Sequence, residues 1–125
     1  MADNQDIIIS SSETTTATYN SPDQDNLNSR GVIVVVDVTA FTGTNYTVSL
    51  QIKDELSGKY VSIAADSAQT ATGTRTLLVY PGAGAAAQGV NVSAGFPLAR
   101  KWRVVITKTA VSAFTATVVA HYTGV

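Results

Sequence analysis

The chain has 125 residues and a net charge of −1, a length that suits one domain and is too short for two. Only 14% of the residues are charged, none is cysteine, and no apolar run approaches the ~18 residues of a membrane span, so we expect no disulfide, thiolate metal site or membrane-spanning helix. Seventeen threonines and sixteen valines favour strands, because β-branched side chains pack well on a pleated surface. The composition therefore predicts an all-β fold.

Residues 1–29 are predicted to form an extended N-terminal arm. They are mostly polar, end in the Pro, Asp and Asn residues that favour turns, and give at most one short strand, near Thr14–Tyr19. Ile7, Ile8 and Ile9 are the apolar exception. We expect this triplet to dock on the body of its own subunit or on a neighbour, as part of an interface.

Charge is distributed unevenly along the chain. Residues 1–29 hold five acids and no base, whereas residues 67–125 hold five bases, among them Arg100, Lys101 and Arg103, and no acid. Chance in a charge-poor chain is one interpretation. The other is that the acidic segment lies across a basic face of its own subunit or of a neighbour, which would make the assembly sensitive to salt. These three bases are therefore further interface candidates.

Residues 30–125 are predicted to form one β-sandwich domain. Val32–Ala40 is apolar on both faces, as is typical of a central strand. Alternation then predicts further strands at 46–53, 59–65, 74–80, 102–108 and 114–122, with the long Gly/Ala-rich segment 81–97 as an interface loop. Several short strands without an amphipathic helix indicate an antiparallel sandwich, immunoglobulin-like or jelly-roll.

No motif in the sequence indicates catalysis or a cofactor. His121, the only histidine, lies on the polar face of a strand, and no Gly-x-Ser-x-Gly sequence accompanies it. The segment Gly82–Ala87 matches G-x-G-x-x-A, but it opens no helix within a βαβ unit, so a nucleotide is not expected. Asp23–Asn28 gathers oxygen-bearing side chains without the EF-hand pattern, and a turn is the stronger interpretation. We therefore predict neither an enzyme nor a metal or cofactor site.

The segment Arg100-Lys101-Trp102-Arg103 combines three bases with the only tryptophan. Such a cluster can bind nucleic acid through phosphate contacts and stacking. Alternation, however, turns Trp102 inward and Arg103 outward, and the net charge of the chain is close to zero. Nucleic acid is therefore an unlikely partner.

Asp37 is a single carboxylate within the most apolar run of the chain. Alternation places it on the mixed face of its strand, where it must be paired with a base, protonated or open to water. Arg103, Arg30 and Lys53 are candidate partners, and Arg103 is preferred because a guanidinium can bind a carboxylate in bidentate fashion. A general acid or base would need a second titratable group, which the sequence does not offer. A structural Asp37–Arg103 ion pair is predicted.

Five segments of the body resemble a known group of proteins: Arg30–Thr39, Leu50–Asp54 with Ser57–Tyr60, Thr72–Thr74, Val79–Gly82 and Trp102–Val104. Together they are similar to small β-sandwich proteins encoded among the head and structural genes of tailed bacteriophages. The resemblance covers about residues 30–125 and does not include the isoleucine triplet.

This resemblance implies a non-enzymatic virion structural protein that decorates or cements the capsid. Its partners would be the major capsid protein lattice and copies of itself in a homo-oligomer, with no small-molecule substrate, cofactor or membrane. It would lie on the capsid surface after synthesis in the bacterial host cytoplasm, which agrees with the absence of a signal peptide in the acidic start MADNQD. The alternatives are a tail or head–tail connector component, or a carbohydrate-binding adhesion module that stacks sugars on Tyr60, Tyr80 or Tyr122.

Overall fold

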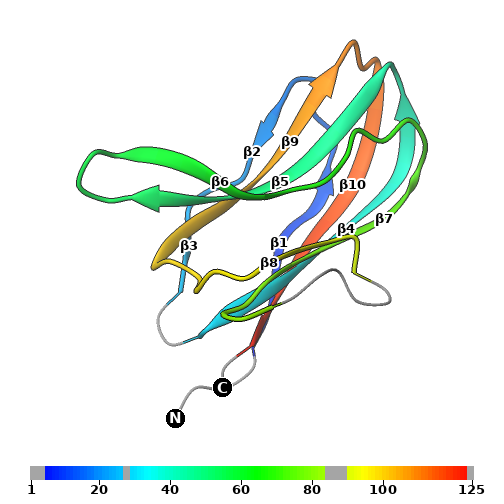
Figure 1. Ribbon diagram of the computed structural model, residues 1–125. Helices are drawn as coiled ribbons and strands as arrows, with labels where there is room; N and C mark the ends of the chain where they lie inside the picture. Colours follow the sequence, from blue (N-terminus) through cyan, green and yellow to red (C-terminus); the bar gives the residue numbers. More distant parts are fainter. Residues whose placement is uncertain (1–4, 27–28, 84–89, 124–125) are drawn as a thin grey trace.

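Two β-sheets packed face to face make up the protein (Figure 1). The computed structural model describes residues 5–26, 29–83 and 90–123. The strands are β1 (Gln5–Glu13), β2 (Tyr19–Asn20), β3 (Gln24–Asp25), β4 (Gly31–Thr42), β5 (Asn45–Asp54), β6 (Lys59–Ala65), β7 (Gly73–Val79), β8 (Val92–Ala94), β9 (Lys101–Thr109) and β10 (Ala113–Thr123). Sheet A has the order β1-β10-β4-β7-β8, and sheet B has the order β2-β9-β5-β6, with β3 also paired to β9. The all-β sandwich predicted from the sequence is confirmed, although one pair, β7 with β8, is parallel.

The hydrophobic alternation of β4 is realised as predicted. This strand lies in the middle of sheet A, between β10 and β7, and its valines at 32, 34, 36 and 38 are buried against sheet B. Asp37 and Thr39 on the opposite face are exposed. A strand with neighbours on both sides has all its ladder hydrogen bonds satisfied, so the long apolar run folds without an unpaired backbone edge.

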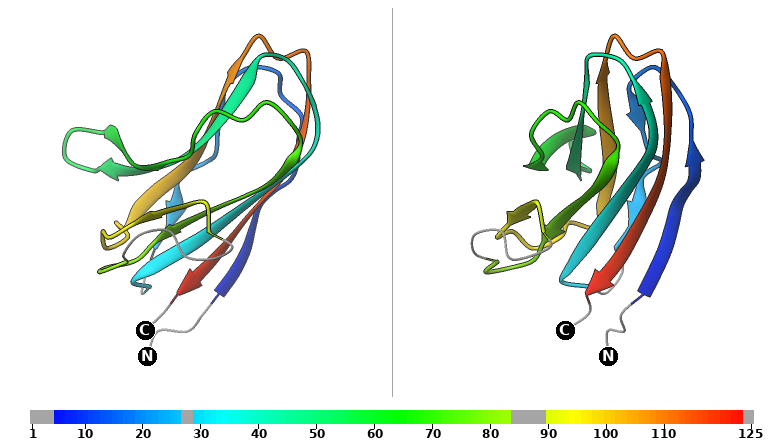
Figure 2. Two further views of the ribbon diagram at one scale, coloured as in Figure 1. Left: turned by 45° about the vertical axis from the view of Figure 1, so that its right-hand side comes forward. Right: turned by 90° about the vertical axis from the view of Figure 1, so that its right-hand side faces the viewer.

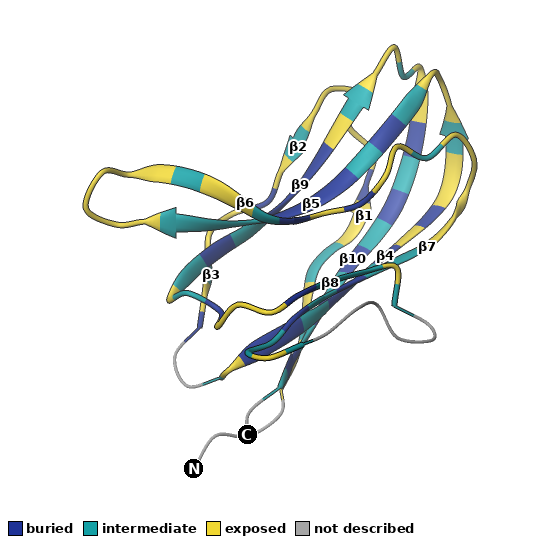
Figure 3. Ribbon diagram, in the orientation of Figure 1, coloured by how far each residue is buried: buried dark blue, intermediate teal, exposed yellow. Residues whose placement is uncertain are grey.

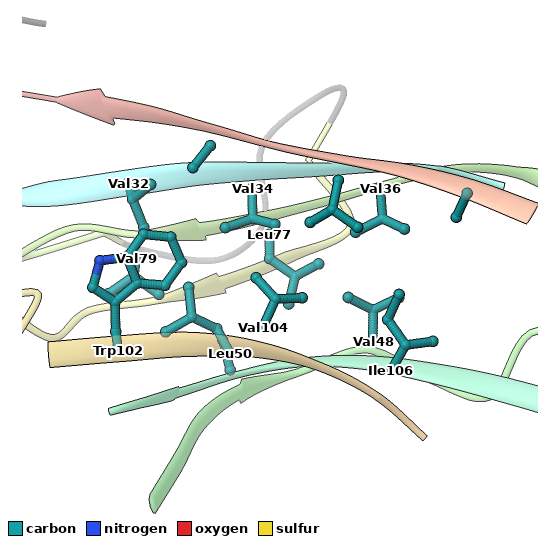
Figure 4. Packing of buried hydrophobic residues seen from close by; sticks show 14 of the residues in the cluster. Val32, Val34, Val36, Val48, Leu50, Leu77, Val79, Trp102, Val104 and Ile106 are labelled. Carbon is teal, nitrogen blue, oxygen red and sulfur yellow. The ribbon is translucent and has the colours of Figure 1, made fainter. Parts of the chain in front are cut away.

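Sheet B contributes the other half of the core through residues that alternate along β5 and β9. The core interdigitates between the two sheets, with the valines of β4 above and the residues of β5 and β9 below (Figure 4). The largest fully buried side chains of sheet B are Trp102, Tyr46, Leu50, Ile106, Val48 and Val104. Each was placed inward by the sequence pattern.

The segment of residues 5–26, here called the N-terminal strap, is not a free arm. Its first strand, β1, pairs with β10 and lies along the outer edge of sheet A (Figure 2). Its two short strands, β2 and β3, pair with β9 at the edge of sheet B. Residue 29 is therefore not a boundary between an arm and a domain, because strap and body share both sheets.

Ser21 keeps the strap in register where Pro22 cannot donate a hydrogen bond. The Ser21 amide donates to the Val104 carbonyl at 2.9 Å, and the Val104 amide donates to Ser21 Oγ at 2.9 Å. A side-chain oxygen thus takes the place of a backbone acceptor between β2 and β3. Proline is tolerated here because this is the edge of the sheet.

The ends of β5 and β6 form a hairpin that projects beyond the sandwich (Figures 1 and 2). The turn Glu55–Gly58 connects them, with Gly58 at φ 75°, a left-handed conformation that glycine adopts without steric cost. Val61 lies opposite Ile52 and therefore shares the inward face of sheet B, yet it is 53% exposed, and Leu56 in the turn is 99% exposed. The exposed surface of this projecting hairpin is evident in Figure 3.

Gly31, at the start of β4, tests how closely this strand packs against β7. A Cβ at this position would lie 2.1 Å from the Val79 carbonyl oxygen, so a backbone shift would be required. Gly31→Ala is expected to lower the free energy of unfolding by roughly 1–3 kcal/mol, the usual cost of overpacking. Urea denaturation would measure it against Thr107→Ala, an exposed control; equal stability of the two variants would contradict the packing described here.

Candidate functional site

The acids of the N-terminal strap pair with bases of the body. In chain order, the pairs are Asp6 with His121 (2.7 Å), Glu13 with Lys108 (2.6 Å), Asp23 with Lys53 (3.3 Å) and Asp25 with Lys101. The acidic segment therefore lies on its own subunit, and two of its acids meet bases of the predicted segment 67–125, namely Lys101 and Lys108, whereas Lys53 and His121 were not among those five bases. The partner in each case is a single side chain, not an extended basic surface.

Glu13 and Lys108 form the most buried of these pairs. Their side chains are 3% and 0% exposed. Lys108 Nζ donates to Glu13 Oε2 and to the Thr15 carbonyl, and it lies 4.0 Å from the centre of the Phe114 ring. Glu13 Oε1 accepts a hydrogen bond from the Thr15 amide at 2.8 Å. Both charges are thus paired and hydrogen-bonded, the condition under which a buried ion pair is tolerated.

A second polar connection joins the sheets farther along the interior. Trp102 Nε1 of sheet B donates to the hydroxyl of Tyr122 in sheet A at 3.1 Å. That hydroxyl donates to the Asp25 carbonyl of the strap at 3.0 Å. Burial raises the pKa of the Tyr122 phenol, so the neutral donor persists across the neutral pH range. Tyr122 is 3% exposed and cannot stack on a sugar.

A polar cluster lies at the base of the projecting hairpin. The Tyr60 hydroxyl donates to Asp23 Oδ1 at 2.6 Å, and Lys53 Nζ donates to Asp23 Oδ2 at 3.3 Å. The Arg103 guanidinium lies 3.5 Å from the centre of the Tyr60 ring, and its Nε donates to Gln51 Oε1 at 3.0 Å. Strap, β5, β6 and β9 meet here, and the hairpin is thereby fixed to the body.

The cluster changes the acidity of its own members. The hydrogen bond from Tyr60, ahead of the interaction with Lys53, holds the pKa of Asp23 below its ordinary value. The same bond raises the pKa of Tyr60, because it favours the protonated phenol. Asp23 therefore stabilises the fold above its unfolded-state pKa, and that contribution is lost as the pH falls through the lower folded-state pKa.

The predicted Asp37–Arg103 ion pair is wrong. Asp37 lies on the exposed face of sheet A, where Thr74 Oγ1 donates to its carboxylate at 3.2 Å. Arg103 belongs to sheet B and binds Gln51 and Tyr60 instead. Alternation correctly turned both side chains outward, but it did not show that their strands belong to different sheets. Asp37 is instead open to water, which was one of the alternatives predicted for it.

The remaining sequence candidates are dispersed. Ile7 and Ile9 pack against the core of their own subunit, whereas Ile8 is 67% exposed. Of the predicted interface bases, Lys101 and Arg103 are held within the chain, and Arg100 is exposed. The segment 23–28 is described only to Asn26 and contributes the short strand β3, and most of the Gly82–Ala87 motif lies outside the described residues. The described part of the chain contains no group of three or more potential metal ligands.

One further ion pair had no signal in the sequence. Arg75 of β7 binds Asp66 in bidentate fashion, at 2.5 Å from Nε and 2.8 Å from Nη2. The Asp66 side chain is 2% exposed, and its residue directly follows β6. The pair therefore connects sheet A to the loop that leaves sheet B. It could not be identified beforehand because β6 and β7 had no predicted spatial relation.

No family model, curated protein or solved structure matches this chain. Within the described residues there is also no helix long and apolar enough to cross a membrane. Function must therefore be argued from the surface of the molecule together with the resemblance in its sequence.

Breaking the buried pair should destabilise the protein strongly. Glu13→Gln leaves the Lys108 charge buried without its partner and should cost roughly 3 kcal/mol of unfolding free energy. The double variant Glu13→Gln/Lys108→Met should recover part of that loss, because no uncompensated charge remains. Urea denaturation provides the measurement. Asp25→Asn, which breaks a more exposed pair, is the control and should cost below about 1 kcal/mol; an equal cost for the two single variants would contradict this account.

The polar cluster predicts that two substitutions raise the pKa of Asp23 by different amounts. Tyr60→Phe should return the pKa of Asp23 toward its ordinary value, and Lys53→Gln should do so to a smaller extent, because the Tyr60 hydrogen bond is the larger influence. A carboxyl-carbon NMR titration of both variants would establish the order. The reverse ranking would show that charge, not hydrogen bonding, controls this carboxylate.

Proposed function

We propose that the chain is a non-enzymatic structural protein of a bacteriophage virion that decorates the capsid by binding the major capsid protein lattice. The proposal is motivated by the resemblance of residues 30–125 to small β-sandwich proteins of tailed phages. A role in a shell also suits a charge-poor chain in which four of the eight lysines and arginines are paired with carboxylates, since such a surface has little affinity for charged small molecules.

The observation that carries the proposal is the projecting hairpin. Its turn presents Leu56 almost completely exposed, and Val61 lies uncovered on the face that elsewhere forms the core. An apolar side chain held out on an ordered support is suited to insertion into a pocket of another protein. The cluster around Tyr60 provides the support, because it holds the base of the hairpin to the body by hydrogen bonds and a cation–π contact.

The direct test is to locate the chain in particles. Virions purified from the phage that encodes the protein should contain it by mass spectrometry, and imaging should find its density on the shell. A ring of density at the tail or neck would support the alternative of a tail or connector component. Absence of the chain from purified virions would overturn the proposal.

Leu56 allows a sharper experiment. Leu56→Ser should reduce the amount of chain bound per particle roughly tenfold, as expected for the loss of an apolar anchor, without changing the melting temperature. Ile8→Ser, which removes another exposed apolar side chain from the strap, is the matched control and should bind like the wild type. Quantitative gel analysis of sedimented particles measures both. Normal occupancy of the Leu56 variant would show that the hairpin is not the contact.

A further inference from the structure

Most lysines and arginines of the chain already have a side-chain partner within it. Of eight lysines and arginines, four form ion pairs with carboxylates and Arg103 is held by Gln51 and Tyr60. Within the described ranges 5–26, 29–83 and 90–123, three remain without a side-chain partner. One is Lys59 on the projecting hairpin; the other two are Arg30 and Arg100, both exposed.

The backbones of Arg30 and Arg100 are connected through one group of hydrogen-bonded residues. The Leu98 amide donates to the Arg30 carbonyl at 3.0 Å, and the Asn26 amide donates to the Arg100 carbonyl at 2.7 Å. The buried Asn26 side chain also donates to the carbonyls of Leu98 (3.1 Å) and Ser29 (2.8 Å) and accepts from the Ser29 amide (2.8 Å). The two guanidinium groups therefore extend from backbone that is fixed before any partner binds, which lowers the entropy lost on binding.

An exposed aromatic ring belongs to the same segment. Phe96 is 55% exposed and lies between Gly95 and Pro97, which are also exposed, two residues before Leu98. Such a ring gains little by facing water. Aromatic and arginine side chains are enriched at the energetic centres of protein interfaces, where the surrounding contacts exclude water from them.

We propose that Arg30, Phe96 and Arg100 form a docking patch for an acidic protein surface. The partner would offer carboxylates to the two guanidinium groups and an apolar pocket to the ring. Charge complementarity commits the patch to an anionic partner, because neither arginine pairs with a carboxylate among the residues that the structure describes. A nucleic acid is disfavoured as the partner, since a chain with a net charge of −1 and only two cations in this patch offers no row of cations to which successive phosphates could bind. The identity of the partner as the capsid lattice rests on the proposed function.

The test compares the full chain with Arg30→Gln/Arg100→Gln and with Phe96→Ser. Each is sedimented with particles assembled without this chain, at low and at physiological salt. The wild type should bind, and each variant should bind roughly tenfold more weakly. The control Ala40→Glu/Ala68→Glu changes the net charge by the same amount at two exposed alanines, one of them nine residues along β4 from Gly31, and should bind like the wild type. Circular dichroism verifies that all variants fold.

Two further probes separate the possible outcomes. Fluorescein-labelled poly-L-glutamate should bind the wild type weakly at low salt and should not bind the arginine variant; a labelled DNA duplex should bind neither. Particle binding that is unaffected in the variants overturns the patch while the proposed function stands. Failure of the wild type to bind particles, with retained arginine-dependent binding of poly-L-glutamate, overturns the proposed function instead. Arginine-dependent DNA binding, or no binding to any probe, overturns the patch.

Discussion

The constraint on which the rest of the structure depends is the passage of one segment from sheet A to sheet B. Residues 5–26 supply the edge strand β1 of one sheet and the edge strands β2 and β3 of the other, and the Glu13–Lys108 pair lies where the segment crosses. Because both charges are buried, each requires the other, and neither sheet can detach its edge without exposing the unmatched partner. The strap is thereby part of the domain, although its composition resembles that of a disordered tail.

The local sequence pattern was sufficient to predict side-chain orientation wherever a strand has one buried face and one exposed face. The alternation along β4, β5, β9 and β10 predicted the inward residues correctly, because the period of two is a property of the strand itself. The strap had no such pattern. Register shifts between Ile8 and Ser10 and between Ser10 and Glu13 interrupt its alternation. Its partners in β9 and β10 are far away in sequence, from 76 positions for Asp25 with Lys101 to 117 for Gln5 with Tyr122. Long-range pairing of this kind has no local signature.

The polar contacts show the same contrast between local features, which could be predicted, and long-range pairing, which could not. That Asp37 and Arg103 face outward could be predicted; that they occupy the outer faces of different sheets could not, since this depends on strand order. The charge asymmetry, by contrast, correctly predicted two contacts between the start and the end of the chain, Glu13 with Lys108 and Asp25 with Lys101. Four of the eight lysines and arginines are used in ion pairs. Among the described residues the bases that remain without a side-chain partner are Lys59 on the projecting hairpin, Arg30 and Arg100, and these have capacity for another molecule.

Pairing of the strap with β9 and β10 also determines when the fold can close during synthesis. Strands β1, β2 and β3 leave the ribosome well before β9 and β10, the strands with which they pair. Until residues 101–123 have emerged, Ile7 and Ile9 have no core to cover, and Glu13 has no base beside it. The nascent chain therefore carries an unpaired segment, part apolar and part acidic, until β9 and β10 have been synthesised, and the polar and charged residues of that segment oppose its aggregation in the meantime.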